Sequence, residues 1–263
     1  MERKFSLSLV VAVFNEEQLL EEFTLKALRD LAAVANDFEI VFVDDGSTDR
    51  SRAMEDELAR KYPQIKLVKL AKNGGLGNAY AAGFKAATKE VVFNNTVDSF
   101  FDTAELPQLL PYLEKADVLS CYRTNTKSNN PYQKILTLGN YWLLRILFPV
   151  KLKAYQTLQF YRRDFYQAID IESRSTFIAP EQLMKAIAMG KSVAEVPIVY
   201  HPRKKGEAKG GKPKFVLQTF RDILKFWFRW VVLRRPMVIA GGQKYPIRSY
   251  YSEKLKRGTE SSV

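Results

Sequence analysis

The sequence contains little cysteine and little histidine. Cys121 and His201 are the single residues of their kinds among the 263 residues of the chain. One cysteine excludes an internal disulfide framework and a cysteine-based zinc site. One histidine excludes a histidine-rich metal site and argues against a Ser–His–Asp triad. The common thiol and imidazole chemistries are therefore not expected of this chain.

Long apolar runs are also absent. No stretch approaches the roughly 20 apolar residues that cross a bilayer, so we expect no spanning helix. The N-terminus begins basic and then apolar, but the run ends at Asn15-Glu16-Glu17 without a small-residue cleavage site, unlike a signal peptide. With 46% hydrophobic residues, the chain has enough apolar material for one large α/β domain.

Acidic residues are few relative to basic ones. The chain has 41 Lys and Arg against 29 Asp and Glu, a net charge of +12. This excess favours an anionic partner, such as nucleic acid, a membrane surface or a phosphorylated substrate. No recognised nucleic-acid motif occurs, and the acids described below gather where a phosphate backbone would be repelled. We therefore expect no nucleic-acid partner.

The most informative stretch is FEIVFVDDGSTD, Phe38–Asp49. Phe38–Val43 is mostly apolar and contains β-branched residues, which is typical of a buried strand. Asp44 and Asp45 follow at its carboxyl end, where open α/β sheets bind ligands. Two carboxylates there can accept hydrogen bonds from a base edge or from ribose hydroxyls. The alternative is that both only cap a turn, and for the pair we favour a function.

The rest of this stretch predicts a turn into a helix over about Thr48–Lys61. Gly46 permits a sharp turn, and Ser47 and Thr48 are natural helix N-caps. Asp49 is expected in the first helical turn, where negative charge is favourable. Strand, helix and strand in succession imply a parallel crossover. Further strands are expected over Leu7–Phe14, Ile65–Leu70, Asp117–Arg123 and Gln156–Arg163, and helices over Glu17–Ala35 and Ala179–Met189.

A glycine-rich turn, Asn73–Asn78, opens a further helix to about Lys89. Such a turn can bring backbone N–H groups close to a phosphate, although the signal is weak alone. It matches neither the G-x-G-x-x-G pattern nor a P-loop. The next strand, Glu90–Val97, ends in Asp98. In a parallel sheet, Asp44, Asp45 and Asp98 would face one cleft.

Several segments in this order resemble the family 2 glycosyltransferases of the GT-A type. The likeness is strongest to members that act on polyprenyl phosphates, such as dolichol-phosphate mannose synthases and undecaprenyl-phosphate sugar transferases. It extends to about Pro236 and implies a Rossmann-like, mostly parallel α/β sheet flanked by helices, with amphipathic helices at the C-terminus. The matching segments are Val13–Glu17, Val43–Asp49, Lys72–Ala79, Thr96–Leu110 and Glu195–Gly211.

The resemblance also implies roles for individual residues. It places Asp98 as the second acid of the family's D-x-D motif, which holds Mg²⁺ or Mn²⁺ on the nucleotide diphosphate. It places Arg123 near the cleft, and it implies that Arg203 and Lys209 close over the donor diphosphate. In relatives an acid near Glu181 faces the cleft. The residues implied for the nucleotide pocket are Phe14, Glu16, Asp44, Asp45 and Asn73.

Two positions depart from the family's pattern. Thr96 replaces the first acid of D-x-D, and a hydroxyl is a poorer cation ligand. Asp98, diphosphate oxygens and waters could hold the metal; Arg203 and Lys209 could replace part of its work; or catalysis could be lost. We favour the first, because magnesium readily keeps waters.

The second departure concerns the general base. The loop Lys151–Gln156 lacks the Asp that many relatives carry. A sugar hydroxyl must lose a proton during attack. A phosphate monoester, with its second pKa at about 6, is largely ionised at neutral pH and can attack unaided. The missing base therefore favours a lipid-phosphate acceptor and is equally consistent with a non-catalytic protein.

Two helices are candidate contacts for a lipid. Tyr132–Phe148 contains aromatic residues, for which core packing is the favoured alternative. Phe215–Arg235 places Arg221, Lys225 and Arg229 on one stripe and six apolar residues opposite them, which is typical of an interfacial membrane helix. A helix packed on the domain is the alternative. The apolar residues are Phe220, Ile223, Leu224, Trp227, Trp230 and Val231.

These features predict a GT-A domain over residues 1–214, an interface helix over 215–236 and a tail over 237–263. The expected function is sugar transfer from a UDP- or GDP-linked donor to a polyprenyl phosphate at an anionic membrane surface, on the cytoplasmic face. The alternatives are a saccharide acceptor and a catalytically impaired nucleotide-sugar-binding protein. The sugar, the base and the oligomeric state stay open, with a homo-oligomer among the alternatives.

Overall fold

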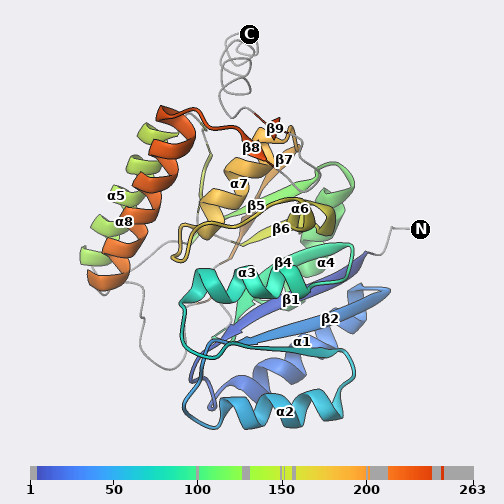
Figure 1. The fold of residues 1–263 in the computed structure, drawn as a ribbon. Helices are drawn as coiled ribbons and strands as arrows, with labels where there is room; N and C mark the ends of the chain where they lie inside the picture. Colours follow the sequence, from blue (N-terminus) through green and yellow to red (C-terminus); the bar gives the residue numbers. More distant parts are fainter. Residues whose placement is uncertain are drawn as a thin grey trace.

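One large sheet forms the centre of the molecule (Figure 1). The structure is a computed structural model that describes residues 5–98, 101–125, 131–148, 150, 152–155, 158–199, 201, 213–238 and 244–245. Within them, seven strands join in the order β3-β2-β1-β4-β6-β5-β7, and all run parallel except β6. The strands are β1 (Ser6–Val13), β2 (Asp37–Asp44), β3 (Ile65–Lys69), β4 (Val91–Thr96), β5 (Val118–Arg123), β6 (Gln159–Arg162) and β7 (Val193–Ile198), with a separate hairpin of β8 (Met237–Val238) and β9 (Lys244–Tyr245).

Helices cover both faces of this sheet. A five-residue π-helix, Phe228–Val232, continues the last long helix, and 3₁₀ turns flank the shortest one. The helices are α1 (Leu20–Val34), α2 (Ser51–Lys61), α3 (Leu76–Ala86), α4 (Leu106–Leu109), α5 (Pro131–Leu147), α6 (Arg163–Ala168), α7 (Ile178–Ala188) and α8 (Pro213–Trp227).

The alternation of side chains along each strand produces two cores. In β2, Ile40 and Phe42 point to one face of the sheet, while Val41 and Val43 point to the other. The first face packs against α1, α2 and α4. The second face packs against α3, α6 and α7, and its core continues into α5 and α8. Because the strands are buried on both sides, they appear in the sequence as nearly continuous apolar runs.

The expected α/β class and mostly parallel sheet are confirmed, and element boundaries shift by a few residues. The helix after β2 begins at Ser51 rather than near Thr48, so Asp49 precedes it instead of lying in its first turn. Asp49 Oδ1 accepts a hydrogen bond from Ser51 N at 2.9 Å. Ser47 and Thr48 bond to Asn15 instead of capping the helix. The expected roles of these three residues were therefore wrong: Asn15, just beyond the end of β1, is the partner of Ser47 and Thr48, and Asp49 lies before the helix.

Close packing of α3 on the sheet depends on a glycine. A Cβ placed on Gly83 would lie 2.3 Å from Val10 Cγ1 and 2.8 Å from Val43 Cγ2. We expect Gly83→Ala to lower the free energy of unfolding by about 1–3 kcal/mol through overpacking, measured by urea titration. Gly139 in α5 is the control, because a Cβ there meets nothing within 4 Å. Gly139→Ala should raise stability by up to about 1 kcal/mol through helix propensity, and equal effects of the two variants would contradict this packing.

Candidate functional site

The strands β1, β2 and β4 end together at one edge of the sheet. Val13, the last residue of β1, pairs with Asp44 of β2, and Ala12 pairs with Thr96 of β4. The chain leaves β1 for β2 on one side and returns to β4 on the other, so β1 marks the point where the strand order reverses. Ligands of open α/β sheets bind at such a point, outside the carboxyl ends of the strands.

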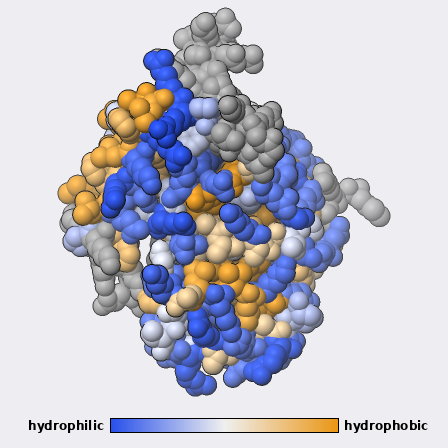
Figure 2. Space-filling model, viewed as in Figure 1, coloured by the Kyte–Doolittle hydropathy of each residue, from blue (hydrophilic) through white to orange (hydrophobic). Residues whose placement is uncertain are grey.

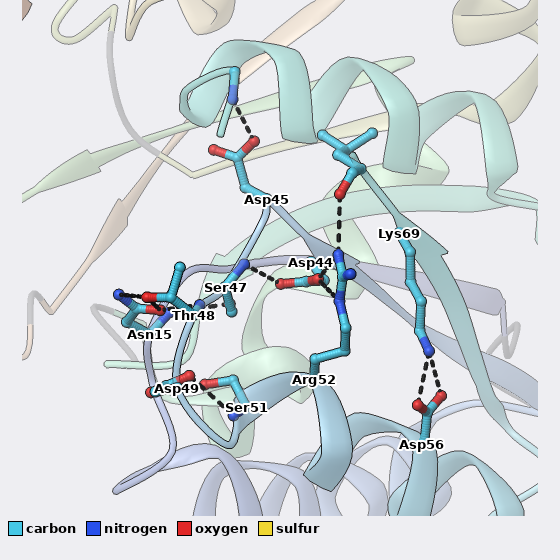
Figure 3. Close-up of polar contacts among 12 residues, drawn as sticks. Asn15, Asp44, Asp45, Ser47, Thr48, Asp49, Ser51, Arg52, Asp56 and Lys69 are labelled. Carbon is cyan, nitrogen blue, oxygen red and sulfur yellow. Dashed lines mark hydrogen bonds and ion pairs between the residues drawn. The ribbon is translucent and has the colours of Figure 1, made fainter. Parts of the chain in front are cut away.

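The two consecutive aspartates at this edge point in different directions (Figure 3). Asp44 is fully buried, and its carboxylate accepts from Ser47 N at 2.8 Å and pairs with the Arg52 guanidinium at 2.5 Å. Asp45 points toward the start of α3 and accepts from Gly74 N at 2.8 Å and Gly75 N at 3.0 Å. Asp44 therefore shapes the turn, while Asp45 joins β2 to the glycine-rich turn.

Burial raises the pKa of Asp45 above its usual value. The charge of Asp44 adds to this effect, while the N–H groups of Gly74 and Gly75 oppose it. A carboxylate that remains partly desolvated at a sheet edge is typical of a functional position. The expectation of one cleft shared by three carboxylates is corrected for Asp44, because its two oxygens serve Ser47 and Arg52.

The glycine-rich turn lies directly against the end of β2. Gly46 has φ +75°, and a Cβ there would lie 2.7 Å from Asn73 N. Asn73 is exposed, and Phe14 is half-buried immediately after Val13, whose carbonyl accepts from Asp45 N at 2.8 Å. Phe14, Asp45 and Asn73 are thus brought to one place. Glu16 follows, half-buried, with its N–H donating to Ser51 Oγ at 2.8 Å.

Asp98 lies just beyond the end of β4. It is half-buried, and its charge contributes, after burial itself, to raising the pKa of Tyr80 on α3. Thr96 is the last residue of β4 and is half-buried. In the part of the chain that the structure describes, no three His, Cys, Asp or Glu side chains gather to hold a metal ion. A protein-only metal cage is therefore not built from these residues.

Of the remaining predicted basic residues, the structure describes Arg123, which belongs to the other half of the sheet. Arg123 is the last residue of β5, which runs in the same direction as β4, so it ends at the same edge. The segment that follows β7 also starts at this edge, where His201 Nε2 lies 2.9 Å from Glu105 Oε1. Arg203 and Lys209 lie outside the described residues.

Glu181 does not face the cleft as expected. It is fully buried, and its carboxylate accepts from Glu172 N and Ser173 N, both at 2.8 Å. Lys185 pairs with the same carboxylate at 2.7 Å. Glu181 is therefore a structural anchor for the segment before α7.

Sequence reasoning missed two residues near the edge. Arg174 reaches the first turn of α3, where its Nη1 donates to Asn78 Oδ1 at 2.7 Å. Glu195 of β7 accepts from Lys153 N at 2.6 Å, so a carboxylate reaches the loop that has none of its own. No local motif marks either residue, because both contacts join segments that are distant in the sequence.

Exposed apolar side chains gather on α5 and α8, the two helices at the left of Figure 1, and Figure 2 shows hydrophobic atoms over this region; we call it the α5–α8 apolar face. Four side chains come from α5 and four from α8 with the π-helix that continues it, spaced alike at three, four and four residues, with exposures between 37% and 77%. A groove of about 430 Å³ runs between the two helices. The expectation that the predicted helix Tyr132–Phe148, observed as α5, packs into the core is therefore wrong for these four side chains of α5. The side chains are Ile135, Leu138, Trp142 and Ile146 of α5, and Leu217, Phe220 and Leu224 of α8 with Phe228 of the π-helix that continues it.

A different stripe of α8 and of the π-helix that continues it packs on the domain. Ile223, Phe226 and Trp230 are buried in the core. Trp230 is thus a packing residue rather than part of the outer face, and Arg229 pairs with Glu172 at 2.5 Å. Arg221 and Lys225 are exposed beside the outer apolar stripe. Among the described helices, none is both long and apolar enough to span a bilayer.

Comparison with known proteins identifies the family. The profile described as glycosyl transferase family 2 matches residues 8–170, well over half of the chain. The chain belongs to this family. It is 27% identical over 230 residues to dodecaprenyl-phosphate galacturonate synthase of Rhizobium johnstonii, covering 84% of this chain and 65% of that protein. It is 28% identical over 234 residues to dolichol-phosphate mannosyltransferase of Pyrococcus furiosus, with coverages of 85% and 64%. The chain thus spans slightly less than two thirds of these curated relatives.

Comparison with solved structures supports the fold. Glucosyl-3-phosphoglycerate synthase from Mycobacterium tuberculosis, crystallised with Mn²⁺, UDP and phosphoglyceric acid, superimposes with a TM-score of 0.64. The match covers 85% of this chain and 78% of that one, at 16% identity. At this identity the likeness establishes the GT-A fold and leaves ligands to be argued from the chain's own residues.

Glu55 of α2 is a buried acid beside the candidate site. It is fully buried, and neither carboxylate oxygen has a hydrogen-bond partner in the described structure. Burial raises its pKa from 4.5 to about 8; the charges of Asp44 and Asp56 add to this, while Lys69 and Arg52 oppose it. Near neutral pH the folded protein therefore holds this carboxyl protonated behind Asp44.

This raised pKa predicts a pH dependence of stability. From about pH 4.5 to about pH 8 the unfolded chain releases the Glu55 proton while the folded chain keeps it, so the stability contribution is lost as pH rises. The slope approaches about 1.4 kcal/mol per pH unit. Glu55→Gln has no proton to release at this position, so it should not show this loss. Its free energy of unfolding, measured by urea titration, should therefore increase relative to that of the wild type as the pH rises. The control is Glu57→Gln, at an exposed position of the same helix. Parallel stability curves for the wild type and Glu55→Gln would refute the assignment.

Proposed function

We propose that this chain transfers a sugar from a UDP- or GDP-linked donor to a polyprenyl phosphate at the cytoplasmic surface of a membrane. The observation that carries the proposal is that the α5–α8 apolar face occurs in the same molecule as a sheet edge of the kind that binds nucleotides, formed by the carboxyl ends of β1, β2 and β4. Soluble monomeric proteins rarely expose so much contiguous apolar surface without a partner. The names of the relatives, which act on dodecaprenyl phosphate and dolichol phosphate, support this acceptor class.

The donor nucleoside is assigned to the end of β1 and β2. Phe14 offers a half-buried ring for stacking, and Asp45 offers its carboxylate to a base N–H or ribose hydroxyl. Asn73 is exposed beside Asp45, and Glu16 follows Phe14 at the same edge. Asp44 supports this pocket from behind through Ser47 and Arg52, and we assign it no direct contact.

The donor diphosphate is assigned to the ends of β4 and β5, near Asp98 and Arg123. One carboxylate with a neighbouring Thr96 hydroxyl suits an open site for Mg²⁺ or Mn²⁺, in which waters and diphosphate oxygens complete the ligands. When bound, such a cation stabilises the charge that grows on the leaving diphosphate. By family resemblance, Arg203 and Lys209 would add donors to the same oxygens.

The reaction needs no general base from this chain. A phosphate oxygen of the acceptor forms the new bond to the anomeric carbon, while the bond from that carbon to the diphosphate oxygen breaks. The diphosphate leaves with the electron pair, and no proton has to move. With a second pKa of about 6, the acceptor phosphate is largely dianionic at neutral pH. This agrees with the absence of a carboxylate from residues 151–156.

The lipid chain and the bilayer are assigned to the α5–α8 apolar face. Fully burying a side chain of Leu, Ile or Phe size contributes about 1.5–3 kcal/mol. Arg221 and Lys225 flank this face, and a basic group near an anionic bilayer adds about 1 kcal/mol. This arrangement fits a peripheral contact in which the apolar stripe enters the interface and the basic groups meet lipid headgroups.

The first test measures donor binding and turnover together. Calorimetry with UDP and GDP should detect binding of at least one. Asp45→Ala should weaken that binding tenfold or more, about 1.4 kcal/mol, because the base or ribose loses its acceptor. Asp44→Asn should instead mainly lower the free energy of unfolding, because the Arg52 ion pair weakens.

Turnover then separates the alternatives. Incubation of UDP- and GDP-sugars with a short polyprenyl phosphate and Mg²⁺ should produce a glycosylated lipid phosphate. Product formed only with a saccharide acceptor would replace the lipid proposal. Nucleotide binding without any turnover, restored by Thr96→Asp, would identify an impaired enzyme whose D-x-D pair had been lost.

The second test addresses the α5–α8 apolar face with liposomes. The wild type should bind anionic liposomes better than neutral ones, and salt should weaken the preference. The double variant Arg221→Glu/Lys225→Glu should lose the preference. The double variant Leu217→Ser/Phe228→Ser should bind both liposome types more weakly, because the apolar contribution does not depend on lipid charge.

The buried stripe supplies the matched control for these variants. Phe226→Ser, on the buried side of α8, should lower stability instead of acting selectively on liposome binding. If the wild type shows no affinity for any liposome, the lipid assignment of this face is wrong.

A further inference from the structure

A short segment, residues 172–176, connects the outer helix α8 with the glycine-rich turn. Four successive backbone N–H groups in this segment are held by two carboxylates from different helices. Glu181 of α7 accepts from residues 172 and 173, both at 2.8 Å. Asp222 of α8 accepts with one oxygen, Oδ2, from Arg174 N and Ser175 N, both at 3.1 Å. The segment's path therefore depends on where α8 sits.

Two further contacts join the same segment to α8 and to the π-helix that continues it. Arg229 Nη1 donates to Glu172 Oε2 at 2.5 Å, and Thr176 Oγ1 lies 3.2 Å from Thr219 Oγ1. Asp222 is the only acidic residue between Pro213 and Arg235. An aspartate is unusual in a helix otherwise rich in basic and apolar side chains, and its carboxylate serves the segment rather than the solvent.

On its other side the segment touches the glycine-rich turn. A Cβ on Gly77 would lie 2.6 Å from the carbonyl carbon of Arg174, and one on Gly75 would lie 3.3 Å from its oxygen. The Arg174 side chain reaches Asn78 at 2.7 Å. Gly75 N in turn donates to Asp45. A continuous chain of contacts thus runs from Asp222 through Arg174 and the turn to Asp45.

We propose that Asp222 is a positioning residue for the donor nucleotide: through residues 172–176 it holds the glycine-rich turn in the place where that turn supports Asp45. The inference rests on the nucleotide site proposed above. Because Asp222 lies on the helix that carries the outer apolar stripe, a shift of α8 at a membrane would reach the nucleotide site by the same contacts. Coupling of this kind requires a physical connection, which these contacts supply.

The sign of the expected effect separates positioning from simple electrostatics. Removing a negative charge near a site for an anionic nucleotide should tighten binding. Losing the two hydrogen bonds to Arg174 N and Ser175 N should loosen the turn and weaken binding. We expect Asp222→Ala to raise the Kd for UDP or GDP by roughly three- to tenfold. Asp222→Asn keeps an acceptor oxygen at the same place and should restore most of the affinity.

The control for charge is Asp170→Ala. Asp170 is exposed, lies two residues before Glu172, and pairs at 3.6 Å with the exposed Lys85. Its removal changes the net charge by the same amount without touching a backbone N–H of the segment. It should leave the Kd unchanged or slightly lower. A double-mutant cycle between Asp222→Ala and Asn78→Ala should be non-additive, because both variants release Arg174.

Hydrogen exchange gives a readout that does not require nucleotide. In Asp222→Ala the amides of residues 74–78 and 172–176 should exchange faster than in the wild type, while those of the β1–β2 core stay protected. Urea titration verifies that the variant is folded. If the wild type binds neither UDP nor GDP, the proposed function fails. If it binds and Asp222→Ala changes neither the exchange nor the Kd, the positioning role is wrong and the donor site stands.

Discussion

The constraint on which the candidate site depends is the bond between Asp45 and the N–H groups of Gly74 and Gly75. These groups come from two strand ends, β2 and β3, that no single local motif joins. Burial raises the pKa of Asp45 even with both N–H groups in place. The fold therefore holds a partly desolvated carboxylate at the sheet edge. Carboxyl groups whose pKa is shifted in this way are concentrated at functional sites.

Most of the fold could be predicted because its determinants are local. Apolar runs that alternate with amphipathic helices identify a parallel sheet, and the positions of the six predicted strands of the large sheet were correct to within a few residues, although β7 was not predicted. Helix starts were less accurate for a physical reason. Ser47 and Thr48 are good caps in isolation, but Asn15, which is distant in sequence, takes their hydrogen bonds, and α2 begins later.

The location of the site could be predicted from the sequence, but the role of each residue in it could not. Asp44 and Asp45 are the same residue type, and only the direction of each side chain decides which one faces α3. Glu181 appeared to be a cleft acid, yet it is buried under the segment that it caps. Arg174 and Asp222 carried no signal, because their contacts join elements that lie about 50 to 100 residues apart. The roles of these residues follow from their tertiary contacts and not from any local sequence pattern.

The stripes of α8 show why its amphipathic pattern alone was ambiguous. One stripe, formed by Ile223, Phe226 and Trp230, is buried in the core. The helix therefore cannot rotate to bury its other stripe without exposing these three side chains. Leu217, Phe220, Leu224 and Phe228 must then face outward in the folded chain. At about 1.5–3 kcal/mol for each fully buried side chain of this size, even partial burial of the four would supply several kcal/mol of binding free energy. Since Asp222 on the same helix holds the segment against the glycine-rich turn, whatever covers the outer stripe also bears on the geometry around Asp45.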